Sequence, residues 1–459
     1  MNEVRKLSDI LNNLDTWSDK TIKQSFFGKF LNKCLKNKIT INLPNAFPIS
    51  IPILILSIGV LFISLSSPQF ANDRFGIGII ILICFVIFLI NLFSGNLKNK
   101  IKLDSIDLLI LIFSFILVVS AFNSYFFKES LIGLFKYFVF FIWYFLIKIT
   151  LLNSSRKTFL NLWIFLFLCA TITALIGICQ YIIGVEPLAT WEDPNFENIH
   201  TRVYSTLGNP NLLAGYSLLI LPMGIVLPFE MKINFITKIL FLIGDSLILI
   251  CLIFTGSRGG YLGLITGAVF SLLVILFSLI KSRNHAFSTF TFLATIIIFI
   301  LAMIFLFPIL QERISTIFTL REHSSNSFRI NVWLACLKML KDNWIFGIGP
   351  GNNTFRLVYG LYMLSGFDAL GAYNIFLEFA LEAGILGFLV FILIQLISLL
   401  KLHYLFWEKG NIFALGIFIS QIALLTHGLV DTILLRPQVF VPYFFLLASI
   451  AKLESKTDN

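Results

Sequence analysis

Residues 374–400 read NIFLEFALEAGILGFLVFILIQLISLL, an apolar run whose only charged side chains are Glu378 and Glu382. At about 1.5 Å per residue, a helix of this length exceeds the roughly 30 Å hydrocarbon core of a bilayer. A helix that is apolar on every side needs an apolar environment all around it. The run therefore predicts a membrane-spanning helix.

The composition extends this prediction to the whole chain. Of 459 residues, 58% are hydrophobic and 13% are charged, and the mean hydropathy is +0.92. Soluble domains carry about 45–50% apolar and about 25% charged residues, so too few charges remain here to cover a water-facing surface. This balance excludes a soluble enzyme, a nucleic-acid-binding protein and a disordered chain. It predicts an integral membrane protein in contact with membrane lipid.

Further apolar runs of about 17–25 residues mark the other expected spans. Together they predict an all-α polytopic fold of about twelve transmembrane helices, with one large extracytoplasmic loop between spans 9 and 10. The expected spans are Pro48–Ser66, Gly76–Ser94, Ile106–Phe122, Leu131–Leu152, Phe159–Ile183, Asn211–Phe229, Thr237–Thr255, Gly259–Ile280, Phe287–Leu310, Asn374–Leu400, Ile412–Val430 and Pro437–Ala451. The chain then divides into a basic tail (1–47), spans 1–9 (48–310), the large loop (311–373), spans 10–12 (374–451) and a short tail (452–459).

The distribution of Lys and Arg predicts how these spans are oriented, because basic residues accumulate in cytoplasmic loops. With a cytoplasmic N-terminus, the inner side receives the tail lysines and most of the other lysines, Lys148 and Lys401 among them. The short outer loops receive only Arg74, Lys128, Arg202, Arg258 and Arg436. The pattern predicts a protein of the cytoplasmic membrane with both termini in the cytoplasm, and it accounts for most of the +10 net charge.

Two segments outside the spans carry amphipathic patterns. In the first tail, one apolar face surrounded by lysines fits a helix on anionic lipid, and a disordered basic tail fits the same residues. That face consists of Phe26, Phe27, Phe30, Leu31, Cys34 and Leu35. In the large loop, Ser327–Asp342 predicts a helix with Ser327 as its N-cap and a face suited to the membrane surface. The members of this face are Ile330, Trp333, Leu334 and Leu337.

Cysteine and glycine patterns argue against two common kinds of site. The six cysteines include no CxxC pair and no Cys/His cluster, so we expect neither a structural disulfide nor a metal site. The run Gly347-Ile-Gly-Pro-Gly351 follows no strand and precedes no Lys-Ser/Thr pair. It therefore predicts a helix stop and a turn rather than a nucleotide loop, and we expect no cofactor.

Ionisable groups within spans usually pair, line a cavity or serve a mechanism. Asn374, Glu378 and Glu382 recur at every fourth residue and share one helix face. Helix capping and pairing with loop arginines would explain them, although Glu382 lies roughly 12 Å into the helix, too deep for capping alone. His427 and Asp431 repeat this spacing at the outer end of span 11, where a structural role for the histidine is the alternative.

Four arginines are expected on the same outer side. Arg258 sits in Gly-Ser-Arg-Gly-Gly, where glycines leave backbone amides free for an anion and the guanidinium offers a forked donor. A tight hairpin with a solvated arginine is the alternative. Arg202 precedes the turn Gly-Asn-Pro-Asn, Arg329 lies in the loop helix and Arg436 precedes the last span. A mixed arginine–carboxylate cavity that opens outward predicts an anionic or phosphate-bearing ligand.

Over roughly residues 50–450 the sequence resembles the O-antigen ligase/polymerase superfamily. The likeness lies in the Ser257-Arg258-Gly259 turn, in the loop containing Arg329, Trp333 and Gly-Ile-Gly-Pro-Gly, and in Glu-Ala-Gly-Ile-Leu-Gly at 382–387. The cyanobacterial IctB-type branch, which is associated with bicarbonate transport, is similar in further motifs. These are RVYSTLGNPNLLAG (202–215), GAYN (371–374) and HGLVDT (427–432) followed by Arg436-Pro437.

The superfamily likeness implies a metal-independent enzyme that moves a glycan from an undecaprenyl-diphosphate carrier to an acceptor hydroxyl at the periplasmic face. It implies that Arg258, with Arg202 and Arg329, holds the diphosphate. The ligase pattern has a histidine, proposed as the general base, where this chain has Tyr373 before Asn374. A tyrosine of pKa about 10 is a poor base at neutral pH, so Glu378 or His427 would have to replace it.

The branch likeness implies a role in bicarbonate or inorganic-carbon accumulation, and the missing ligase histidine makes this our first prediction. A glycosyltransferase that uses a polyprenyl-diphosphate-linked glycan is the alternative, so whether the chain is an enzyme stays open. The anion-binding candidates are Arg202, Arg258, Arg329 and Arg436, the catalytic candidates are Glu378 and His427, and the cavity-lining candidates are Tyr373, Asn374, Glu382 and Asp431.

Overall fold

The computed structural model describes residues 2–25, 81–82, 85–86, 103–186, 202–231, 233–281 and 325–455. Every regular element in these residues is a helix. Three of the expected spans lie outside the described residues, apart from four residues of the second: Pro48–Ser66, Gly76–Ser94 and Phe287–Leu310. The apolar face expected at residues 26–35 also lies outside them.

The other long helices lie where spans were expected. Six are long and apolar enough to cross a membrane: α6 (Ser105–Asn123), α7 (Phe127–Asn153), α8 (Arg156–Ile183), α9 (Pro210–Glu230), α10 (Phe235–Phe254) and α16 (Ile375–Trp407). Three further helices complete the bundle: α11 (Arg258–Lys281), α17 (Ile412–His427) and α18 (Pro437–Glu454). The protein is thus an integral membrane protein that is helical throughout its described elements, and the full number of twelve spans stays a prediction.

Side-chain caps determine where several of these helices begin. The Asp104 carboxylate accepts the backbone N–H of Asp107, whose side chain accepts the N–H of Asp104 in return, which forms a capping box before α6. Asn209 caps α9, and Pro210 follows at the first helical position. Both devices satisfy or remove N–H groups that a helix start leaves unpaired.

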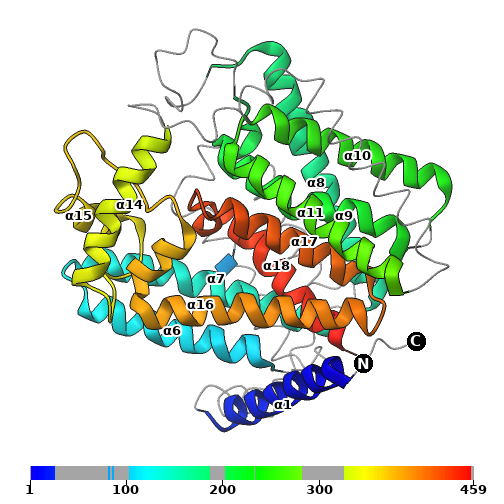
Figure 1. Ribbon diagram of the computed structural model, residues 1–459, viewed down its shortest axis with the longest axis horizontal. Helices are drawn as coiled ribbons and strands as arrows, with labels where there is room; N and C mark the ends of the chain where they lie inside the picture. The colour runs from blue at the N-terminus through cyan, green and yellow to red at the C-terminus, as the bar shows by residue number, and fades with distance from the viewer. Residues whose placement is uncertain are drawn as a thin grey trace.

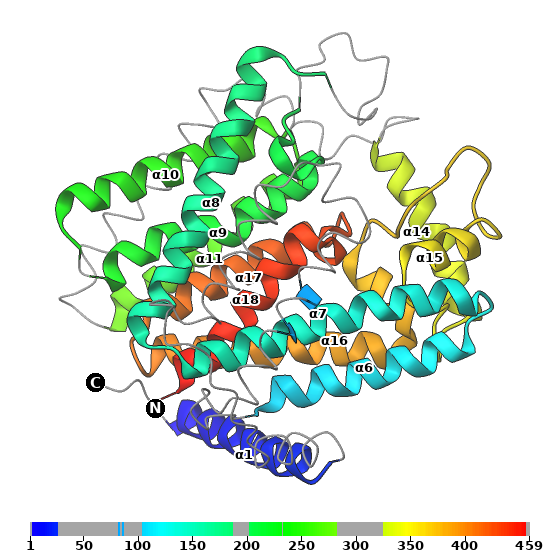
Figure 2. The same cartoon turned by 180° about the vertical axis from the view of Figure 1, so that it is seen from behind.

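The bundle helices pack in two groups (Figures 1 and 2). In one group α9 packs against α8, α10, α11 and α17, and in the other α7 packs against α6 and α18 while α16 packs against α6. Contacts of α17 with α16 and of α18 with α9 join the groups. Since α9 is buried along most of its length, this helix forms the centre of the first group.

Two further helices, α14 (Ser325–Asp342) and α15 (Asn352–Tyr359), lie together where α16 begins, which we call the loop end of the bundle (Figure 1). α14 begins at Ser325 rather than after the expected Ser327 cap. Its buried face packs in a small core with Phe355, Tyr359 and Leu381. This buried face consists of Val332, Ala335, Cys336 and Met339, whereas the face predicted from the sequence is exposed at Ile330, Leu334 and Leu337.

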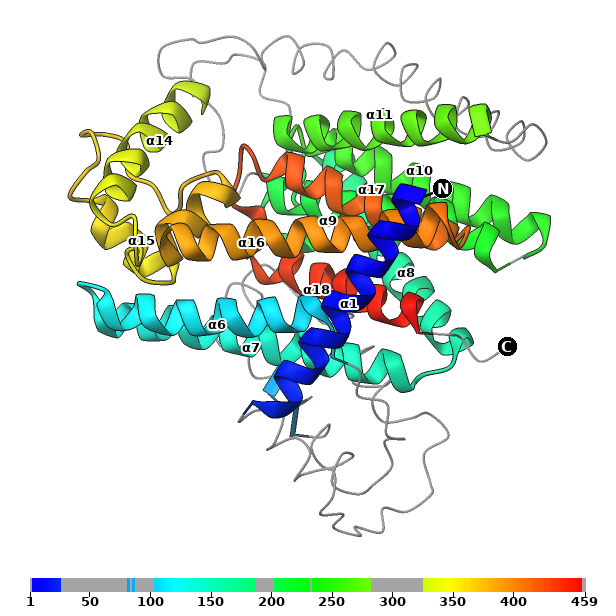
Figure 3. The same ribbon diagram turned by 60° about the horizontal axis from the view of Figure 1, so that its bottom comes forward.

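At the opposite end, which we call the tail end, α1 (Asn2–Gln24) crosses the bundle near the start of α6 (Figure 3). The Asp15 carboxylate of α1 accepts hydrogen bonds from the backbone N–H and the hydroxyl of Ser105, at 3.0 and 2.7 Å. It also accepts one from Lys401 Nζ at 2.7 Å, and Lys401 reaches Glu454 at 3.0 Å. One carboxylate therefore fixes α1 to α6 and α16.

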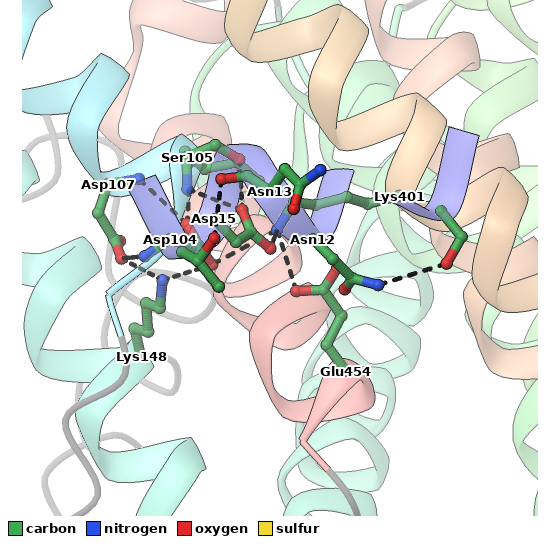
Figure 4. Close-up of polar contacts among 12 residues, drawn as sticks. Asn12, Asn13, Asp15, Asp104, Ser105, Asp107, Lys148, Lys401 and Glu454 are labelled. Atoms are coloured by element: carbon green, nitrogen blue, oxygen red, sulfur yellow. Dashed lines mark hydrogen bonds and ion pairs between the residues drawn. The ribbon is translucent and has the colours of Figure 1, made fainter. Parts of the chain in front are cut away.

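A second lysine completes the group that we call the tail-end cluster (Figure 4). Its members are Asp15, Asp104, Ser105, Asp107, Lys148, Lys401 and Glu454. Lys148 Nζ lies 2.7 Å from Asp104 and 2.5 Å from Asp107. Both lysines, which the sequence analysis counted on the inner side, are buried within α7 and α16, and their orientation stays a prediction. Burying an ammonium group is tolerated here because carboxylates pair with it directly.

Candidate functional site

α16 is broken at Gly384, whose φ of 67° lies in the left-handed region. The chain that follows α14 supplies hydrogen bonds at the break. The N–H of Ile348 donates to the carbonyl of Leu381 at 2.7 Å, and the N–H of Ile385 donates to the carbonyl of Trp344 at 2.8 Å. The run predicted as a simple turn is therefore packed against a membrane helix.

Glu382 connects this run to the bundle. Its carboxylate accepts the N–H of Gly351 at 2.7 Å and the hydroxyl of Tyr137 on α7. Its carbonyl accepts the hydroxyl of Ser120 on α6 at 2.5 Å. Because the side chain is 2% exposed and both carboxylate oxygens have partners, Glu382 holds three segments together at the loop end.

Tyr373 lies among charges contributed by three segments. Its φ of 49° is unusual for a residue other than glycine, and such conformations often mark functional positions. Burial raises the pKa of its hydroxyl and the charge of Asp431 raises it further, whereas Arg329 and Arg436 oppose the shift. The structure thus brings Arg329, Arg436 and Asp431 within electrostatic range of Tyr373, whose hydroxyl is ionised at neutral pH even less often than that of a free tyrosine.

Asn374 and Glu378 organise the start of α16. The Asn374 side chain accepts the first free N–H groups of the helix and donates to the carbonyl of Leu429 at 2.9 Å. This geometry fits the capping alternative. Glu378 is 1% exposed, accepts the N–H of Ala372 and lies within electrostatic range of Arg436.

His427, the last residue of α17, is completely buried. Its imidazole lies against α11, since a Cβ placed on Gly259 would stand 2.4 Å from ring carbon Cδ2. Arg258 directly precedes Gly259, so the segments carrying Arg258 and His427 meet at this point. The charges of Asp431 and Arg329 also act on the ring.

Several buried polar atoms of α14, α17 and α18 have no hydrogen-bond partner within the described residues. They are both ring nitrogens of His427, Nε of Arg329 and Oε1 of Gln438. The large majority of buried side-chain polar atoms in native proteins are paired with protein or water. Unpaired atoms of both polarities on three segments therefore indicate a place where a ligand or water binds.

Arg202 is bound into the same end of the bundle. Its Nε donates to the carbonyl of Thr255 at 2.8 Å, and its Nη2 donates to Oδ1 of Asn211 at 3.0 Å. The Asn211 amide in turn donates to the carboxylate of Asp431 at 2.6 Å. Arg202 thus supports the turn before α11 and is connected to Asp431 through one side chain.

The structure therefore brings most of the predicted site residues to the loop end. We call this group the arginine–carboxylate site: Arg202, Arg258, Arg329, Arg436, Tyr373, Asn374, Glu378, His427 and Asp431. Glu382 lies one turn further along α16, and its carboxylate already accepts hydrogen bonds from Tyr137 and Gly351. The roles of Glu382 and of the arginine–carboxylate site in binding and catalysis stay predictions.

Sequence reasoning missed Tyr137 and Asn211, which connect these residues. Two signals could have identified them. Tyr137 is a polar residue within an expected span, and Asn211 belongs to the Gly-Asn-Pro-Asn turn that follows Arg202. Trp333 was assigned to the membrane-facing side of α14, but its indole N–H donates to the carbonyl of Ala372 at 2.9 Å. It therefore helps to hold the segment before Tyr373.

Residues 243–392 match the family model described as O-antigen ligase. The match runs from α10 into α16 and includes Arg258, Arg329, Tyr373 and Glu378. A comparison with curated proteins finds no match. This part of the chain is an O-antigen ligase family domain within a helical membrane protein, and the match does not distinguish the IctB-type branch.

Proposed function

We propose that this protein is a membrane glycosyltransferase of the O-antigen ligase type, which moves a glycan from a polyprenyl-diphosphate carrier to an acceptor hydroxyl. One observation carries the proposal: the imidazole of His427, with both nitrogens unpaired, lies on Gly259 beside Arg258. This contact puts a candidate base next to an arginine turn inside the matched domain.

The arginines are suited to the leaving group. When the glycosyl–oxygen bond of the donor breaks, negative charge develops on the departing diphosphate, and fixed guanidinium groups stabilise that charge. Arg258 and Arg329 are the candidates for direct contact, since Arg329 has a buried Nε without a partner among the described residues. Arg202 already donates to Thr255 and Asn211, so it positions the turn that carries Arg258.

His427 is the better placed of the two candidate bases. It would take the proton of the acceptor hydroxyl as that oxygen bonds to the sugar and the polyprenyl diphosphate leaves. Asp431, four residues further on, acts on the ring electrostatically and would stabilise the resulting imidazolium. Glu378 is already engaged by the N–H of Ala372, and the raised pKa of Tyr373 disfavours it as a base.

Aromatic packing among four of the described helices favours chemistry at one end over passage of bicarbonate between these helices. The rings of Phe379 and Phe391 stack with centroids 4.1 Å apart, and Phe113 contacts Phe379 edge-on at 5.6 Å. Phe141 contacts both Phe113 and Phe444. These rings pack against one another between α6, α7, α16 and α18.

The test uses the full-length protein in liposomes that contain a polyprenyl-diphosphate-linked glycan and an acceptor lipid. We expect glycan transfer, seen as a mobility shift of the acceptor on a gel. Arg258→Ala and His427→Ala should abolish the transfer. Arg356→Ala, which removes only an exposed pair with Asp368, should leave it intact.

The same liposomes distinguish glycan transfer from the bicarbonate-transport hypothesis. Absence of transfer, together with a bicarbonate flux that depends on the protein and is lost in Arg258→Ala, would overturn the proposal in favour of transport. In cells, loss of the gene should change the surface polysaccharide profile, and the Arg258→Ala gene should fail to restore it. An unchanged profile would contradict the proposal.

A further inference from the structure

The turn between α14 and the break in α16 carries three exposed apolar side chains in succession. Trp344, Ile345 and Phe346 are 56%, 43% and 45% exposed. Their backbone faces α16, because the carbonyl of Trp344 accepts the N–H of Ile385, while their side chains point away from the protein. Three adjacent large apolar side chains in such a position need a covering environment.

The position of the break along α16 indicates what that environment is. From Glu382 to Lys401 the helix is free of charged side chains, and this stretch is about 28 Å long at about 1.5 Å per residue. The hydrocarbon core of a bilayer is about 30 Å thick. Since Lys401 belongs to the charged tail-end cluster, the break at Gly384 lies near the opposite boundary of the hydrocarbon core.

The exposed turn also continues an apolar surface that faces lipid. Leu386, Leu389 and Leu393 of the candidate span α16 are exposed and begin directly beside the turn. The outward face of α14 extends the same apolar character at Ile330, Leu334 and Leu337. Tryptophan is enriched at membrane–water boundaries, which fits Trp344 at this level.

Irregular backbone is tolerated at membrane depth only where its polar groups are paired. Here the N–H of Gly347 donates to the carbonyl of Asn343 at 2.9 Å, and the N–H of Ile348 donates to Leu381. The carbonyl of Trp344 is also paired. These bonds pair three backbone groups of the turn on its protein side, and its outer side is apolar.

We propose that residues 344–346, together with the exposed face of α14, insert into the bilayer and are covered by lipid acyl chains. The large loop is then a partly embedded element that holds α14, and with it Arg329, at the membrane–water boundary. The inference concerns lipid contact alone and does not depend on the glycosyl-transfer reaction.

The test places a nitroxide spin label at Ile345→Cys in the full-length protein, reconstituted in phosphatidylethanolamine–phosphatidylglycerol vesicles. Leu393→Cys on α16 serves as the lipid-facing reference, and Asp368→Cys, whose side chain is 59% exposed in an ion pair, as the water-facing reference. Collision rates with oxygen, which partitions into lipid, and with a water-soluble nickel chelate are measured by electron paramagnetic resonance.

We expect the oxygen-to-nickel collision ratio at residue 345 to exceed that of the Asp368 label several-fold and to stay below that of the Leu393 label, which lies deeper along α16. A ratio equal to that of the Asp368 label would overturn the proposal. Brominated lipids provide a second measurement without a label: they should quench the Trp emission less in Trp344→Phe than in the unaltered protein. Equal quenching would likewise contradict the proposal.

Discussion

The hydroxyl of Tyr137 donates a hydrogen bond to the carboxylate of Glu382, which joins α7 to α16 immediately before the break at Gly384. The other carboxylate oxygen accepts the N–H of Gly351. One buried side chain thereby connects two bundle helices and the segment that follows α14. The loop end owes its shape to this pair as much as to apolar packing.

Removing the Tyr137 hydroxyl should therefore destabilise the protein. Tyr137→Phe leaves a buried carboxylate oxygen without its donor, which costs about 1–3 kcal/mol. We expect a lower midpoint of thermal unfolding in detergent. Tyr125→Phe is the matched control, because Tyr125 is 83% exposed, and it should leave the midpoint unchanged. Equal midpoints for both variants would show that the hydrogen bond is not important for stability.

A methyl group added to Gly259 should displace His427. Its Cβ would stand 2.4 Å from the ring, closer than real contacts allow. If His427 is the base, a shift of about 1 Å should reduce glycan transfer by about 100-fold. Gly267→Ala on the same helix is the control, because its nearest contacts are 3.3 and 3.5 Å and should adjust. Full transfer by Gly259→Ala would remove His427 from the mechanism.

The membrane helices could be predicted from the sequence because apolar runs and caps are local signals. Expected bounds such as Phe159–Ile183 and Ile412–Val430 differ from α8 and α17 by only a few residues. The grouping of arginines with His427 and Asp431 followed from alternating the direction of the spans. These predictions needed no knowledge of which helices touch.

The rest depends on contacts between distant segments. The break at Gly384 is stabilised by backbone hydrogen bonds with Trp344 and Ile348. The sequence Glu-Ala-Gly-Ile alone does not predict that this segment lies beside it. Lys148 and Lys401 lie near the ends of expected spans, and only the fold brings Asp107 and Asp15 to them. Helix α1 was missed since its polar side chains were counted as a tail.

Acid should weaken the tail-end cluster through Asp104. Burial alone would raise the pKa of this carboxyl, but the charges of Lys148 and Lys401 outweigh it and hold the pKa below its usual range. A group with a lowered folded-state pKa adds stability above its unfolded pKa of about 3.9, and that stability is lost as the pH falls toward the folded value.

Asp104→Asn keeps a good helix cap and removes the charge. At pH 7 we expect a loss of about 2 kcal/mol, the worth of a hydrogen bond to a charged group. The difference from the unaltered protein should shrink below about pH 4, as measured by unfolding midpoints at each pH. A difference that stays constant across this range would contradict the electrostatic role of Asp104.

Docking of α1 should depend on Asp15. This residue accepts bonds from Ser105 and Lys401, whereas the apolar contribution of α1 to the core comes from few side chains, Leu11 and Ile22. Breaking a buried pair by removing one partner costs about 3–5 kcal/mol. Asp15→Ala should therefore release α1 while the capping box, Lys148 and the bundle helices stay in place.

Limited proteolysis measures this release directly, since a detached helix is cleaved quickly and a docked one is protected. We expect faster cleavage within residues 2–25 in Asp15→Ala, with the rest of the chain as resistant as before. Asp19→Ala is the control, because it removes only the partly exposed pair with Lys23, a kind of pair worth about 0–1 kcal/mol. Equal cleavage of the two variants would mean that apolar contacts alone hold α1, and the buried carboxylate would then need another explanation.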